Sequence, residues 1–326
     1  MGDAVKVMRG VWRPVSLLVV VCGAGSLSCQ RAAPPAPPMA QAAPRAALVM
    51  SGDGTHIHYE VYGSGPPLLV INGAFGQDST GYDTLARLLA GAHQVVLFDR
   101  RGTGRSPIAD MRNEDVSFAL MAADIEAIRN ALGHTQWSVL GHSFGGMLAS
   151  YYVTEHPERV DRLVLSSSSG VDQALFDEDP RTHIHARLTE DDRSELLEIE
   201  ARHADGLTTA AELERFTHIL SRAYVYDDVH TDWVVTRLQG QQQEVGRLVT
   251  EDMRRIEFDC KPGLAEFQRP TLILQGDADV FPSAISERAL QILPRATLVT
   301  LPETGHYGWI EHPELYRDTV LDFLAQ

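Results

Sequence analysis

The sequence predicts an α/β fold in which a mostly parallel sheet is covered by helices on both faces. Short, almost continuously apolar runs alternate along the chain with longer helical patterns, as is typical of parallel strands joined by helices. The 326 residues are 44% hydrophobic and 22% charged, so the chain is able to bury a substantial core. One long stretch late in the chain lacks the strand pattern, which indicates a helical insertion.

The elements follow in a regular order. Residues 48–50 and 55–62 flank the turn-forming sequence Ser-Gly-Asp-Gly at 51–54, which predicts an antiparallel hairpin. Buried strands are expected at 68–71, 94–98, 137–140, 160–165, 271–274 and 297–301. Helices are expected at about 82–90, 114–132, 144–155, 283–293 and 313–324.

The insertion interrupts this alternation. From Gly170 to about Phe267 the strand pattern stops, and acidic helical segments such as 190–204 and 210–226 take its place. We therefore expect a core formed by residues 48–170 and 268–326. A helical cap over residues 171–267 is expected to lie over the sheet.

The first 29 residues have the pattern of an export signal. Lys6, Arg9 and Arg13 precede an apolar run over 15–21, and small residues follow. A membrane-spanning helix needs about 20 apolar residues, so this run is too short to span. We expect a signal peptide over 1–29, an extended Ala/Pro-rich linker over 30–47, and a location in the periplasm, the cell envelope or outside the cell.

Two fates of the leader remain open. The sequence Ser-Leu-Ser-Cys at 26–29 resembles a bacterial lipoprotein box, with its leucine one place nearer the cysteine than is usual. Lipidation of Cys29 would attach the protein to a membrane. Ordinary signal cleavage near the Ala-Gln-Ala sequence at 40–42 is the alternative.

Charge and cysteine content exclude other classes. The formal net charge is −16, which repels nucleic acid phosphates and argues against a nucleic-acid partner. Outside the leader the chain has only Cys260, so no internal disulfide framework is possible there. Nothing near Lys261 and Pro262 would activate this thiol, and Cys260 is therefore expected to be structural.

The sharpest motif is Gly-His-Ser-Phe-Gly at 141–145, which lies between a predicted strand and a predicted helix. A serine on such a turn needs small neighbours, because strand and helix pass close to each other there. The sequence predicts Ser143 as a nucleophile. A serine hydroxyl is a weak nucleophile unless a base, oriented by a carboxylate, activates it.

Two loops further along the chain supply that base and that carboxylate. Asp279 lies in the loop after the strand at 271–274, and His306 lies in the loop after the strand at 297–301. Asp277 is the nearest competitor for the acid and is expected to cap the loop. Asp172 is a weaker alternative.

The other histidines are assigned different roles. His142 is expected to pack at the turn rather than to act as the base. His183 and His185 are two residues apart, a spacing that could suggest a pair of metal ligands. No third ligand is evident, and we expect both side chains to be solvated. The sequence therefore implies no metal and no cofactor.

An acyl-transfer site also needs two N–H donors aimed at the oxyanion. One comes from the residue after the nucleophile, which is Phe144. The loop Asn-Gly-Ala-Phe-Gly at 72–76 follows an early strand, and the Ala74 N–H is the expected second donor.

Over residues 48–326 the sequence resembles the α/β-hydrolase superfamily. Residues 98–106, Phe-Asp-Arg-Arg-Gly-Thr-Gly-Arg-Ser, look like its D-x-R-G-x-G-x-S loop, and residues 156–165 look like the stretch that follows the nucleophile helix. The resemblance implies the α/β-hydrolase fold, a Ser143–Asp279–His306 triad, and a small-molecule or short-peptide substrate.

Within the superfamily, the Arg-Gly-Thr-Gly-Arg-Ser loop and the helical insertion look most like prolyl aminopeptidases, also called proline iminopeptidases. That group usually has His-Gly-Gly-Pro-Gly at the place of residues 72–76 and Gly-Gly-Ser-Trp-Gly-Gly at the place of residues 141–146. The turn found here is equally common in esterases and carbon–carbon bond hydrolases. The resemblance therefore indicates the chemistry better than the substrate.

We expect a serine hydrolase that cleaves an ester or amide bond through an acyl-enzyme, and the resemblance implies a substrate like that of prolyl aminopeptidases. The alternatives are a carboxylesterase, a carbon–carbon bond hydrolase and, from another class, a non-catalytic binding protein, which usually lacks a triad member. An aminopeptidase must bind the substrate's ammonium group, which carboxylates of the cap would do. The cap carboxylates include Asp177, Glu178, Asp179, Glu190, Asp191, Asp192, Glu212 and Glu214.

Overall fold

The computed structural model describes residues 43–176 and 181–326. The predicted signal peptide, Cys29, the alternative cleavage site at 40–42 and most of the linker lie outside these residues. So do the cap carboxylates at 177–179. Within the described part of the chain, no helix has both the length and the apolar character needed to cross a bilayer.

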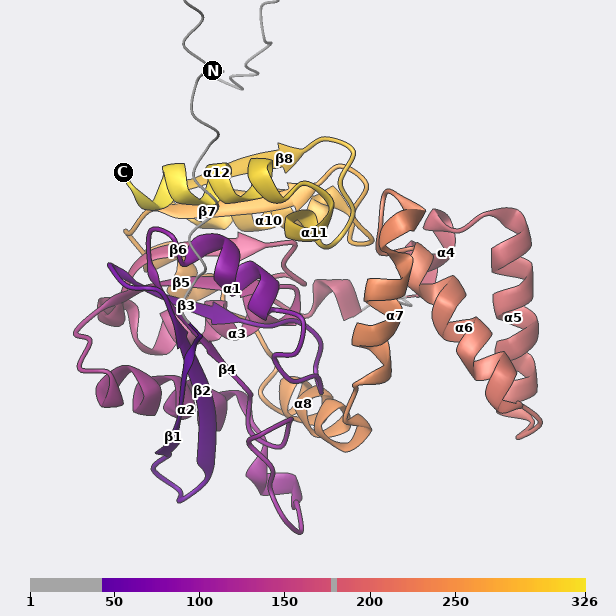
Figure 1. The fold of residues 1–326 in the computed structure, drawn as a ribbon, viewed down its shortest axis with the longest axis horizontal. Coiled ribbons are helices and arrows are strands. Elements are labelled where there is room, and N and C mark those ends of the chain that lie inside the picture. Colours follow the sequence, from indigo (N-terminus) through magenta and orange to yellow (C-terminus); the bar gives the residue numbers. More distant parts are fainter. Residues whose placement is uncertain (1–42, 177–180) are drawn as a thin grey trace, which may run out of the picture. The chain divides into compact units, whose positions relative to one another are not determined.

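The described residues form an eight-stranded sheet with the order β1-β2-β4-β3-β5-β6-β7-β8 (Figure 1). Its strands are β1 (Arg45–Met50), β2 (His56–Tyr62), β3 (Pro67–Ile71), β4 (Gln94–Phe98), β5 (Trp137–His142), β6 (Val160–Ser166), β7 (Thr271–Gly276) and β8 (Ala296–Leu301). The hairpin β1–β2 is antiparallel, and β2 also pairs antiparallel with β4. The pairings from β4 to β8 are parallel. The mostly parallel sheet is therefore confirmed.

Side chains of the central strands are buried on both faces of the sheet. On β3, the neighbouring residues Leu69 and Val70 belong to two different hydrophobic clusters, because successive side chains of a strand point to opposite faces. By contrast β1 is an edge strand with exposed Leu48 and Met50. It begins at Arg45, earlier than the apolar pattern indicates, since its backbone pairs with β2 in register from Arg45 opposite Val61.

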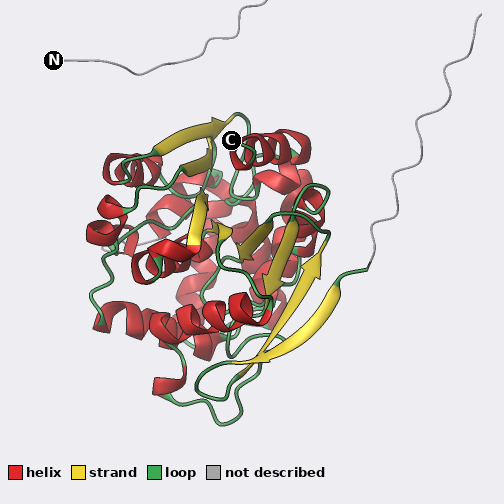
Figure 2. Cartoon of the chain, turned by 90° about the vertical axis from the view of Figure 1, so that its left-hand side faces the viewer, coloured by secondary structure: helices red, strands yellow, loops and turns green. Residues whose placement is uncertain are grey.

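Helices cover both faces of the sheet, as predicted (Figure 2). One cluster contains side chains of α2 (Phe118–Ala131), α3 (Phe144–Glu155) and α10 (Ser283–Ile292). The opposite cluster contains side chains of α1 (Asp83–Leu89), α11 (Gly308–Glu311) and α12 (Pro313–Leu324). The sheet therefore forms the middle of three layers.

The segment between β6 and β7 is helical. It contains α4 (Arg181–Arg187), α5 (Glu190–Ala204), α6 (Ala210–Arg222), α7 (Thr231–Gln239), α8 (Gln243–Arg255) and α9 (Lys261–Glu266). Figure 1 shows α4, α5, α6 and α7 as a group beside the sheet. In contrast α8 packs on the core, where its Asp252 carboxylate accepts the Phe118 N–H at the start of α2 at 2.8 Å.

Candidate active site

Ser143 lies on a strained turn between β5 and α3. Its backbone has φ 55° and ψ −124°, a conformation that non-glycine residues rarely adopt. Backbone hydrogen bonds hold it there, because the Ser143 N–H donates to the Ser166 carbonyl at 3.0 Å and the Ser143 carbonyl accepts the Ser169 N–H at 3.1 Å. The serine side chain is thereby presented at the start of a helix.

The glycines of this turn are needed for close approach. A Cβ atom at Gly141 would overlap the Gly145 carbonyl oxygen, and one at Gly145 would overlap the Ile71 carbonyl oxygen on β3. A Cβ atom at Gly146 would overlap the Ser168 hydroxyl. The structure thus gives the steric reason for the small residues around Ser143.

Asp279 and His306 are brought together behind the site. The His306 Nδ1 lies 2.8 Å from the Asp279 Oδ1, and both residues are buried. Because a carboxylate accepts and does not donate, this contact places the imidazole proton on Nδ1 and leaves the Nε2 lone pair available. The same carboxylate oxygen accepts the Phe281 N–H at 3.0 Å, and the His306 N–H donates to the Tyr224 carbonyl at 2.8 Å.

The two alternative acids have other partners. The Asp277 Oδ1 accepts the Thr304 N–H at 3.2 Å, so this residue caps the loop. Asp172 forms ion pairs with Lys261 at 2.7 Å and Arg288 at 2.6 Å. Neither contact involves His306.

His142 lies in a buried chain of hydrogen bonds beside Ser143. Its Nε2 donates to the His306 carbonyl at 2.9 Å, so its Nδ1 accepts the Tyr82 hydroxyl proton at 2.6 Å. The Tyr82 oxygen in turn accepts the Gly73 N–H at 2.8 Å. Burial lowers the pKa of His142 well below 6.5, and this histidine is therefore neutral in the folded protein.

His183 and His185 are half-buried, and the expectation of two solvated side chains is wrong. Their helix, α4, lies against the pocket described below, and His183 lines it. Among residues 43–176 and 181–326, no three histidine, cysteine, aspartate or glutamate side chains are grouped as metal ligands.

The two expected oxyanion donors face the site from different elements. Phe144 is the first residue of α3, where backbone N–H groups have no partner within the helix. Ala74 lies in the loop after β3 with φ 58°. Within the described chain, neither N–H donates to another backbone carbonyl. Both amides are therefore free to bind an oxyanion.

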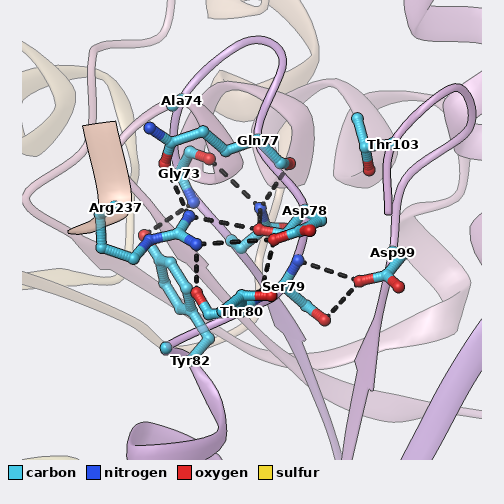
Figure 3. Close-up of polar contacts among 12 residues, drawn as sticks. Gly73, Ala74, Gln77, Asp78, Ser79, Thr80, Tyr82, Asp99, Thr103 and Arg237 are labelled. Carbon is cyan, nitrogen blue, oxygen red and sulfur yellow. Dashed lines mark hydrogen bonds and ion pairs between the residues drawn. The ribbon is translucent and has the colours of Figure 1, made fainter. Parts of the chain in front are cut away.

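The loop that carries Ala74 is held from two sides (Figure 3). From within the loop, the Asn72 side-chain amide donates to the carbonyls of Gln77 at 3.0 Å and Asp78 at 2.8 Å. From α7, the Arg237 guanidinium donates to the Gln77 side chain at 2.6 Å and also to the Thr80 carbonyl. The insertion thus contacts the loop that leads to the oxyanion donor.

Ser143 and His306 line one cavity of about 400 Å³. Apolar side chains dominate its wall: Phe75, Phe144, Leu175, Ile184, Leu238, Met253, Val280 and Phe281. Arg254 of α8 is a charged side chain of this wall, and no carboxylate is found among its described lining residues. Because residues of α4, α7 and α8 complete the wall, the insertion covers the carboxyl ends of β5 and β8.

Three residues around the site, Tyr82, Arg100 and Arg237, belong to no sequence motif that would predict their contacts. Tyr82 and Arg237 act on backbone groups of the loop at 73–80, and their positions depend on how separate elements pack. Arg100 belongs to the loop at 98–106, in which the sequence pattern specifies Asp99 and Arg101 but not the residue between them. Its contacts are described below.

Known proteins resemble the chain over most of its length. Residues 66–313 match the family described as alpha/beta hydrolase fold. A putative carbamate hydrolase RutD from Caulobacter sp. (strain K31) is 26% identical, covering 85% of this chain and 98% of its own. A 2-hydroxy-6-oxononadienedioate/2-hydroxy-6-oxononatrienedioate hydrolase from Pseudomonas putida is 27% identical over 82% of this chain and 91% of its own. The solved proline iminopeptidase of Mycobacterium smegmatis has a TM-score of 0.69 at 20% identity, covering 86% and 98% of the two chains.

Proposed function

Because the chain belongs to the alpha/beta hydrolase fold family, we propose that this hydrolase cleaves carboxylic esters through an acyl-enzyme formed on Ser143. The observation that carries the proposal is the placement of Ser143 and His306 on one cavity, with Asp279 hydrogen-bonded to the far side of the imidazole. A serine and a histidine that an aspartate orients, on the same cavity, support activation of the serine hydroxyl for nucleophilic attack.

In the proposed reaction, the Ser143 Oγ attacks the ester carbonyl carbon while the His306 Nε2 takes the hydroxyl proton. The carbonyl oxygen becomes an oxyanion that accepts the N–H groups of Phe144 and Ala74. The C–O bond to the alcohol then breaks, and His306 returns the proton to the leaving oxygen. Water, deprotonated by His306, attacks the acyl-enzyme, and the acid is released as Ser143 regains its proton.

The wall of the cavity favours an ester over a peptide with a free amino terminus. Binding a substrate ammonium group calls for a carboxylate, and the described wall contributes Arg254 instead. Two of the described cap carboxylates have other partners. Asp192 pairs with Arg222 at 2.7 Å, and Glu212 accepts the Thr209 N–H at 2.8 Å at the start of α6.

Carbon–carbon bond hydrolysis is a second candidate, and Arg254 is the observation that favours it. The relative from Pseudomonas putida is named for dioate substrates, which carry two carboxylates. An exposed guanidinium that lines an apolar cavity is suited to bind one of them. An enzyme specialised for such a substrate would hydrolyse simple esters slowly.

The test compares p-nitrophenyl butyrate, proline p-nitroanilide, its N-acetylated form and a 2-hydroxy-6-oxo-dienoate that carries a second carboxylate at its other end. We expect rapid turnover of the butyrate and none of the anilides. Turnover of the free proline anilide that acetylation abolishes would establish an aminopeptidase instead. Exclusive turnover of the dienoate would establish the second candidate.

Two variants test the chemistry. Ser143→Ala and His306→Ala should each lower kcat by several orders of magnitude, and the double variant should be little worse, because the residues act as a unit. Ser194→Ala, on the exposed surface of α5, is the control and should keep full activity. Fluorophosphonate labelling at another serine in Ser143→Ala would overturn the assignment of the nucleophile.

A further inference from the structure

Arg100 is a buried cation that forms no ion pair with a carboxylate of the described chain. It is 1% exposed, and in the described chain its Nε and Nη1 atoms have no hydrogen-bond acceptor. Its neighbour Arg101 is equally buried but pairs with the Asp124 carboxylate through two hydrogen bonds of 2.7 Å. Burying an unpaired charge is unfavourable, so a role for Arg100 must lie in what it contacts.

The contacts of Arg100 converge on the loop after β3. Its Nη2 donates to the Gly73 carbonyl at 3.1 Å, to the Gln77 carbonyl at 2.9 Å and to the Ala74 carbonyl. The Gly73 carbonyl belongs to the same peptide group as the Ala74 N–H. In a trans peptide the C=O and N–H bonds point in opposite directions, so fixing this carbonyl also fixes the direction of the Ala74 N–H.

The same guanidinium also contacts the residue that supplies the other donor. Its Cζ lies 4.7 Å from the centre of the Phe144 ring, a cation–π contact. Arg100 is therefore in contact with both residues that present the expected oxyanion donors. Burial lowers the pKa of Arg100 to about 9, which leaves the group charged at neutral pH.

We propose that Arg100 is a positioning residue of the oxyanion hole, an inference that rests on the proposed serine hydrolase function. A hydrogen bond to a peptide carbonyl polarises the peptide and strengthens its N–H as a donor. The buried positive charge, which forms no ion pair with a carboxylate in the described chain, favours negative charge on the nearby carbonyl oxygen of the substrate. Both effects grow as the oxyanion develops and act on the transition state more than on the bound ester.

The experiment compares Arg100→Met and Arg100→Lys with the matched control Arg101→Lys in the full chain, using p-nitrophenyl butyrate. In Arg100→Met, kcat should fall roughly 10- to 100-fold, which is less than the loss on removing an oxyanion donor, while KM stays nearly unchanged. Affinity for a trifluoromethyl ketone, which forms an oxyanion on the serine, should fall in parallel. Arg100→Lys should recover part of both losses.

The control separates positioning from a purely structural role. Arg101→Lys should lower Tm, because lysine does not reproduce the two-bond contact with Asp124, while kcat stays unchanged. Arg100→Met removes a donor from the buried carbonyls of Gly73 and Gln77 and should lower Tm as well. Turnover of the Arg100 variants is therefore measured well below Tm, where kcat should fall by more than the lost stability explains. If Arg100→Met does not fold, Arg100→Lys carries the test with a smaller loss of kcat.

Two outcomes overturn different statements. Unchanged kcat and ketone affinity in the Arg100 variants, or losses of kcat that only follow Tm, would overturn the role of Arg100. Butyrate hydrolysis that persists in Ser143→Ala would overturn the proposed function instead. Inactive Ser143→Ala with fully active Arg100→Met would leave the function standing and remove only the inference about Arg100.

Discussion

Asp277 and Asp279 lie two residues apart on the loop after β7, yet they have different partners. Asp279 contacts the imidazole of His306 and the Phe281 N–H through one oxygen, while its second oxygen is buried and has no donor in the described chain. Asp277 accepts the Thr304 N–H. A sequence pattern places both on the same loop, but only packing determines which one reaches the histidine.

Exchanging each carboxylate for an amide tests this difference. Asp279→Asn should lower kcat roughly 10⁴-fold, by analogy with the orienting aspartate of Ser-His-Asp proteases, because an amide favours the wrong imidazole tautomer. Asp277→Asn retains an oxygen that can accept the Thr304 N–H and should lose far less. Steady-state kinetics on both variants measure the effect, and a reversed order would make Asp277 the acid.

At the scale of elements, most helices and strands follow from their sequence patterns. The expected spans 94–98, 144–155 and 313–324 coincide with β4, α3 and α12, because glycine, proline or polar residues mark their ends. The helix expected from residue 114 begins at Phe118 instead. Ser117 caps it by accepting the Leu120 N–H at 3.2 Å, and Asn113–Asp115 form a separate 3₁₀ turn.

Contacts between elements were not visible in the sequence. Arg237 of α7 is 4% exposed and reaches the loop at 77–80, which is more than 150 residues earlier in the chain. No periodicity marks such a residue, because its partners are backbone carbonyls and a glutamine side chain. This contact couples the insertion to the loop that carries Ala74.

Removal of this contact should affect stability and turnover together. Arg237→Met leaves the buried Gln77 side-chain oxygen without this donor, which costs about 1–3 kcal/mol. We expect a lower urea midpoint and a lower kcat, since the loop at 73–80 becomes less well held. Arg247→Met, on the exposed face of α8, should change stability by at most about 0.5 kcal/mol. Equal losses in the two variants would contradict a specific role for Arg237.

For the whole molecule, buried histidines make stability depend on pH. Burial is the largest cause that lowers the pKa values of His58, His93, His134 and His142 below 6.5. These groups bind protons less readily in the folded state than in the unfolded state. Their contribution to stability is therefore present above pH 6.5 and is lost as the pH falls toward their folded pKa values.

We accordingly expect the urea midpoint to fall between pH 7 and pH 5, with each such histidine adding up to about 1.4 kcal/mol per pH unit. His93→Gln should make this dependence less steep, because it removes one buried titrating side chain. Urea denaturation across this pH range measures the effect. Stability that increases on acidification would contradict the assigned direction.

The serine and its two partners are separated along the chain by the whole helical insertion. Ser143 follows β5, whereas Asp279 follows β7 and His306 follows β8. In the sheet, β7 pairs with β6, and β8 pairs with β7. A domain folds as a unit, and the amino-terminal part of its chain is synthesised first. Translation thus synthesises Ser143 well before His306. Under the proposed mechanism, a chain that stops ahead of β8 would be unreactive toward esters inside the cell that makes it.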